Sequence, residues 1–141
     1  NQTDEEIIRN KPKFAADAVR TDWEYTDLDF AAQCRHRLQR QLLELEENER
    51  VREVIVVTHV PLFESQIERN PEDLAWSLGN PYFGHLTMGE AIRGFQKVRY
   101  CVSGHTHLGM NGVVDRVGMP PICTAVIGSD YGKPTWLSLE V

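Results

Sequence analysis

Two short apolar runs constrain the fold of this chain more than any other feature, because each ends at a histidine and a breaker. Residues 54–61 read VIVVTHVP, and residues 100–107 read YCVSGHTH. Such runs are typical of buried parallel strands that stop at a functional loop. Ligands bind beyond the carboxyl ends of strands in an open α/β sheet, so the sequence predicts that His59, His105 and His107 meet in one crevice.

The three strand-end histidines are candidate metal ligands. In an extended segment, His105 and His107 would point to the same face with Cα atoms about 6.6 to 7 Å apart, and Thr106 would point away. Imidazole nitrogens bind divalent metals at about 2.0 to 2.1 Å. The spacing leaves two arrangements open: one shared ion, or two ions about 3.5 to 4 Å apart. Gly104 permits close backbone approach before the pair.

The most regular helical pattern covers residues 27–49. Its apolar residues recur at steps of four, four, four and three, and they are Phe30, Cys34, Leu38, Leu42 and Leu45. His36 falls on the opposite side and is predicted to be a solvated surface residue. Near the start of the chain, Thr3 is predicted to cap a short helix that Pro12 ends.

A third helix is predicted to start at Thr87, with Glu90 completing a capping box. It lies between the strand at 53–58 and the strand that ends at Gly104. A strand, helix, strand order is a crossover that makes the two strands parallel. Both histidine-bearing strand ends are therefore expected at the same edge of the sheet.

After His107 the pattern becomes β-rich. Asn111-Gly112 is predicted to form a tight turn, and the expected strands cover residues 113–117, 122–127 and 134–141. We therefore expect an α/β fold with a mixed sheet and C-terminal antiparallel strands.

The two histidine blocks resemble the last two signature blocks of the calcineurin-like metallophosphoesterases. In that family, Thr-His-x-Pro and Ser-Gly-His-Thr-His supply histidines to a dinuclear metal centre that hydrolyses phosphate esters. The resemblance implies that His59 and His105 bind one metal and His107 binds the other. It also implies a four-layer α/β/β/α sandwich and two divalent ions, which would be manganese, iron or zinc.

The earlier blocks of the family are absent from the 141 residues. These are Asp-x-His, Gly-Asp-x-x-Asp and Gly-Asn-His; the nearest match, Gly79-Asn80-Pro81, has proline in place of histidine and follows the first histidine block. Residues 1–141 are therefore expected to form the C-terminal half of one phosphoesterase domain. The other half, with the remaining ligands and the catalytic acid or base, would lie upstream or on another polypeptide. Alone, the chain is expected to be inactive and either to be marginally stable or to associate with itself.

Two other readings stay open on the residues themselves. Three histidines and an open position can make a mononuclear zinc hydrolase, or the chain can be a non-catalytic, partner-binding fragment. Asp115 and Asp130 are further carboxylates with expected turn or strand-surface roles. The long connection over residues 62–86 is the candidate for substrate selection, and His85 is either a packed residue or a phosphate contact.

The net charge of −6 argues against nucleic-acid binding as the main activity, because proteins that bind nucleic acid usually carry basic patches. A small phosphate ester remains compatible with this charge, since bound cations reverse the local field. There is no apolar run near 18 residues and no signal-peptide pattern, and the three cysteines lie in dissimilar contexts. We therefore expect a cytoplasmic protein with reduced thiols and no membrane contact. The sequence does not identify the phosphate ester.

Overall fold

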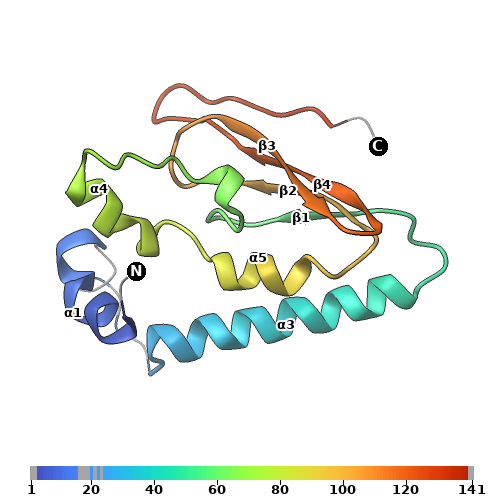
Figure 1. Ribbon diagram of the computed structural model, residues 1–141, viewed down its shortest axis with the longest axis horizontal. Coiled ribbons are helices and arrows are strands. Elements are labelled where there is room, and N and C mark those ends of the chain that lie inside the picture. The colour runs from blue at the N-terminus through green and yellow to red at the C-terminus, as the bar shows by residue number, and fades with distance from the viewer. Residues whose placement is uncertain (1–2, 16–19, 21, 23, 140–141) are drawn as a thin grey trace.

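The computed structural model describes residues 3–15, 20, 22 and 24–139, and these form a mixed α/β unit (Figure 1). The elements in chain order are α1 (Asp4–Phe14), α3 (Asp27–Glu47), β1 (Val54–Val57), the 3-10 helix η1 (Glu64–Gln66), α4 (Leu74–Gly79), the 3-10 helix η2 (Asn80–Tyr82), α5 (Leu86–Ile92), β2 (Val98–Ser103), β3 (Met110–Arg116) and β4 (Met119–Val126).

The four strands form one mixed sheet in the order β1-β2-β4-β3. β2 pairs in parallel with both β1 and β4, whereas β3 and β4 are antiparallel. The parallel crossover and the antiparallel C-terminal pair expected from the sequence are therefore confirmed. The carboxyl ends of β1, β2 and β4 lie at one edge of the sheet, where Val57 pairs with Val102 and Ser103 pairs with Val126.

Helices α3 and α5 lie on one face of this sheet (Figure 1). The core between them contains Leu42, Val56, Ile92, Val98, Cys101 and Ile122. Within the predicted apolar stripe of α3, Leu42 is buried and Cys34, Leu38 and Leu45 pack partly against the core. His36 is exposed, as predicted.

The carboxyl end of α3 is fastened to the start of β2. The Lys97 ammonium donates to the carbonyls of Leu45 (3.1 Å) and Asn48 (2.8 Å) at the end of the helix, where each carbonyl also accepts one backbone amide. The Glu46 carboxylate, also near the end of α3, accepts hydrogen bonds from the backbone amides of Gln96 and Lys97. These contacts fix how the helix lies along the central strand.

Two predicted helix ends differ from the structure. Thr3 caps α1 and forms a capping box with Glu6, as expected, but the helix continues to Phe14 and includes Pro12. Proline has no N–H to donate to the Ile8 carbonyl, so it removes one bond from the last turn, and the helix ends two residues later. The capping box predicted at Thr87 is wrong, because the N-cap of α5 is His85, two residues earlier, and the helix begins at Leu86. The Thr87 hydroxyl instead lies 3.0 Å from the His85 Nδ1 atom.

The predicted turn at Asn111-Gly112 is wrong, because both residues lie inside β3. The hairpin turns at residues 117–118, where Gly118 has a φ of +71°. Gly112 serves a different purpose: a Cβ there would lie 2.7 Å from the Ser65 Cβ atom, so glycine lets η1 pack closely on β3. The strand predicted over 134–141 is absent from residues 134–139, and positions 140–141 lie outside the described residues.

The β3–β4 hairpin is held to the turn after α5 by a buried arginine. The Arg116 guanidinium donates to four backbone carbonyls, those of Arg93, Phe95, Val98 and Pro120. Burial lowers the Arg116 pKa from its usual value, and no carboxylate is needed to pair it because the carbonyls satisfy its donors. This residue lies at the end of β2 that is remote from the histidines.

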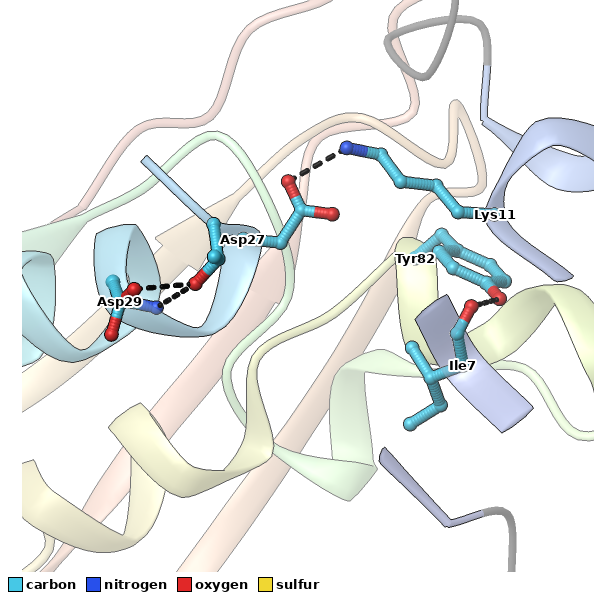
Figure 2. Close-up of polar contacts among 6 residues, drawn as sticks. Ile7, Lys11, Asp27, Asp29 and Tyr82 are labelled. Atoms are coloured by element: carbon cyan, nitrogen blue, oxygen red, sulfur yellow. Dashed lines mark hydrogen bonds and ion pairs between the residues drawn. The ribbon is translucent and has the colours of Figure 1, made fainter. Parts of the chain in front are cut away.

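Helix α1 is attached to the rest of the chain by two polar contacts (Figure 2). The Lys11 ammonium lies 2.7 Å from an Asp27 carboxylate oxygen at the start of α3, and the Tyr82 hydroxyl donates to the Ile7 carbonyl. No helix in the described part of the chain has the length and apolar character needed to span a bilayer.

Candidate metal centre

The loops after β1 and β2 continue the parallel pairing beyond the strands. The Thr58 amide donates to the Val102 carbonyl at 3.0 Å, and the Gly104 amide donates to the His59 carbonyl at 3.1 Å. These two bonds hold the residues after the strands side by side. The histidine that follows each strand is therefore placed at the shared carboxyl edge.

His59 and His105 are in direct contact at this edge. The His59 Nε2 atom lies 3.0 Å from the His105 Nδ1 atom, and the two rings meet edge to face with centroids 4.8 Å apart. Two nitrogens that bind one tetrahedral zinc at about 2.05 Å lie about 3.3 Å apart. The separation of the two nitrogens is therefore close to that of two ligands of one ion, and both rings would have to turn out of their hydrogen bond to direct their lone pairs at a shared metal.

The backbone at His105 adopts a conformation that is rare for residues other than glycine. Its φ is +70°, and the Thr106 amide donates to the Gly104 carbonyl at 2.9 Å, which closes a γ-turn around His105. Such strain costs on the order of 1 to 3 kcal/mol and concentrates at functional sites. The γ-turn directs the His105 ring towards His59.

His107 does not join the pair. Its φ is also positive, at +59°, so the extended geometry assumed for residues 105–107 is wrong. The His107 Nδ1 atom lies 3.5 Å from a carboxylate oxygen of Asp130, and its ring is 5.3 Å from the Tyr131 ring. Within the described ranges, no three His, Cys, Asp or Glu side chains are grouped closely enough to hold a metal.

The two candidate carboxylates have different surroundings. Asp115 is exposed on β3, which agrees with its expected strand-surface role. Asp130 occupies a turn, where its side chain accepts from the Tyr131 amide at 2.7 Å and its backbone pairs with Lys133. Asp130 is therefore the carboxylate that can orient the His107 ring.

The long connection over residues 62–86 is ordered by η1, α4 and η2 and runs beside the histidine pair. The Phe83 ring lies 5.8 Å from the His105 ring and 6.0 Å from the Trp76 ring. Aromatic side chains of this connection therefore lie beside the histidine pair. His85 lies at the N-terminus of α5 and pairs with Thr87 rather than with either histidine of the pair.

Sequence reasoning missed Gln66, whose side chain is fully buried beside the two histidine loops. The partners of its Nε2 atom are 35 to 59 residues away in β2 and β4, so no local pattern marks this contact. Cys101 is also buried here, and burial raises its thiol pKa to about 12.

Comparisons with known proteins gave no match, whether with family models, curated proteins or solved structures.

Proposed function

We propose that this chain is part of a calcineurin-like metallophosphoesterase that hydrolyses phosphate esters at a dinuclear metal centre. His59 and His105 bind one metal ion in this proposal, and His107 binds the second. The observation that carries the proposal is the 3.0 Å contact between the His59 and His105 ring nitrogens, made by a His105 backbone at positive φ. When bound, the two ions would activate water and neutralise charge on the phosphoryl oxygens.

The separate position of His107 supports two metals rather than one ion shared by all three histidines. Its Nδ1 atom faces Asp130, which leaves Nε2 for a metal. A carboxylate on the second ring nitrogen is the usual support of a metal-binding histidine. The donor set of imidazoles fits zinc or iron, and carboxylates from elsewhere would extend it to manganese.

The exposed face of the sheet supports the proposed four-layer sandwich. One row of paired residues crosses all four strands on the face opposite α3 and α5, and it consists of Ile55, Tyr100, Cys123 and Val113. Ile55, Val113 and the nearby Val57 are exposed large hydrophobic residues. A second sheet packed on this row would complete an α/β/β/α arrangement, and the segment that carries it would bring the absent aspartate and asparagine ligands.

Metal binding tests the proposal directly. Purified chain, stripped with a chelator, is titrated with Co²⁺ or Zn²⁺, and the metal per chain is measured by elemental analysis. We expect His59→Ala and His105→Ala each to weaken binding by at least about 10-fold, since each removes one ligand. His36→Ala is the matched control and should bind as the unaltered chain does, because His36 is an exposed residue on α3. Equal binding by all three variants would contradict the proposal.

Activity is tested on the chain extended upstream by about 100 residues, the order of length of the missing half. We expect two metals per chain and hydrolysis of an aryl phosphate mono- or diester only in the extended protein. One tightly held metal that does not change on extension would instead favour the mononuclear three-histidine site.

A further inference from the structure

The side chain of Gln66 is the most connected buried polar group near the candidate metal centre. It is 0% exposed. Its Oε1 atom accepts from the backbone amides of Leu62 (3.0 Å) and Phe63 (3.2 Å). Its Nε2 atom lies within donor distance of the carbonyls of Cys101 (3.2 Å) and Ala125 (2.9 Å) and of the Ser103 hydroxyl (3.1 Å).

The partners outside β4 belong to the segments that carry His59 and His105. Leu62 and Phe63 follow the loop that contains His59, and Ser103 ends β2 two residues before His105. Ala125 lies in β4, which leads to the turn at Asp130. One primary amide therefore joins the loop after β1 to the carboxyl ends of β2 and β4, with its acceptor on the loop and its donors on the two strands.

We propose that Gln66 is a positioning residue that sets the separation of the His59 and His105 rings. The inference rests on the proposed function in that the rings are taken as metal ligands. A metal site requires its ligands to be held within about 0.5 Å of the productive geometry by their supporting residues. The backbone bonds between the loops of His59 and His105 end at Gly104. Beyond His59, the Pro61 carbonyl accepts from the His85 amide, and the Gln66 amide links Leu62 and Phe63 to β2.

The test compares Gln66→Met and Gln66→Glu with a matched variant at the other end of β2. Methionine keeps the length of the side chain and removes all of its hydrogen bonds, whereas glutamate keeps the acceptor for Leu62 and Phe63. Arg116→Met is the control. Arg116 is also buried and also bonds to several backbone groups, but it donates to the carbonyls of Val98 and Phe95 rather than contacting the histidine loops. A purely structural role would make the Gln66 and Arg116 variants behave alike.

The first readout needs no metal. In the unaltered chain the two imidazole rings, with centroids 4.8 Å apart, should give ring-to-ring nuclear Overhauser effects. We expect Gln66→Met to lose them and Arg116→Met to keep them. If Gln66→Met does not give a dispersed amide spectrum, Gln66→Glu carries the same comparison. Retention of the ring contacts in a folded Gln66 variant would overturn the inference.

The second readout is Zn²⁺ affinity. We expect roughly a 10- to 100-fold loss in the Gln66 variants, the usual effect of removing an outer support, and no more than about a 2-fold change in Arg116→Met. Binding by a folded Gln66→Met variant that equals that of the unaltered chain would also overturn the inference. If the unaltered chain binds no Zn²⁺ but Gln66→Met loses the ring contacts, the positioning role holds and the proposed function fails.

Discussion

His85 is held in a site that disfavours its charged form. Burial lowers the pKa of the imidazole below its ordinary value of 6.5, a contact with the Ala31 backbone acts in the opposite direction, and the nearby Arg35 guanidinium lowers the pKa further. The folded chain therefore keeps His85 neutral at a pH where the unfolded chain takes up a proton. Stability should be fully present above about pH 6.5 and should fall as the pH drops towards the lower folded-state pKa.

His85→Gln tests this pH dependence. The loss of melting temperature between pH 7.5 and pH 5.5 should be smaller in this variant than in the unaltered chain, because glutamine does not titrate. His36→Gln is the control, since His36 is exposed and lies on α3. Circular dichroism melts at the two pH values are sufficient. A pH dependence in His85→Gln that equals that of the control would show that His85 contributes nothing to it.

At the scale of elements, α5 is fitted closely against the loop that follows His59. A Cβ atom on Gly89 would lie 1.9 Å from the Leu62 carbonyl oxygen, which is backbone and has no rotamer to change. The Leu62 amide is also held by Gln66. Any side chain at Gly89 must therefore move the helix or the loop.

Gly89→Ala is accordingly expected to lower the free energy of unfolding by about 1 to 3 kcal/mol, the usual cost of overpacking. Gly94→Ala is the matched control, because a Cβ there meets nothing within 4 Å and the φ of Gly94 is not left-handed. The control should change stability by no more than about 1 kcal/mol. Urea unfolding measures the free energy of unfolding of both variants. Equal values would contradict the close fit of α5 against the Leu62 carbonyl.

Elements that depend on local pattern were predictable from the sequence, and those that depend on distant contacts were not. The apolar stripe of α3 and the two strands that end in histidine follow from periodicity and composition. Gly112 was mistaken for a turn residue. Glycine is needed there because β3 packs closely on Ser65, which lies 47 positions away in the chain. No sequence pattern marks the left-handed φ values of His105 and His107. The sequence therefore could not predict that His105 contacts His59 while His107 does not.

At the scale of the whole molecule, the sheet has a helix-covered face and a face that exposes β-branched residues. Val57 on β1 is 73% exposed, and β1 pairs only with β2 within the described residues. Edge strands of this kind are templates for pairing with other chains. The isolated chain is therefore predicted to associate with itself as its concentration rises.

Val57→Lys should weaken this association, because charged residues on an edge strand disfavour further pairing. Val117→Lys is the control, since Val117 is fully exposed at the hairpin turn and belongs to neither the edge strand nor the apolar row. Sedimentation velocity at a series of concentrations measures the difference. Identical sedimentation of the two variants would exclude the β1 edge as the site of association.

The contact between His59 and His105 also spans the boundary between the outermost strand and its only neighbour in the described sheet. Strands at an edge open locally at a smaller free energy than the core does. A ligand that binds only when both rings are in place stabilises the closed form in proportion to the logarithm of its concentration. If the pair binds metal as proposed, the stability of the pairing between β1 and β2 would rise with the concentration of free metal.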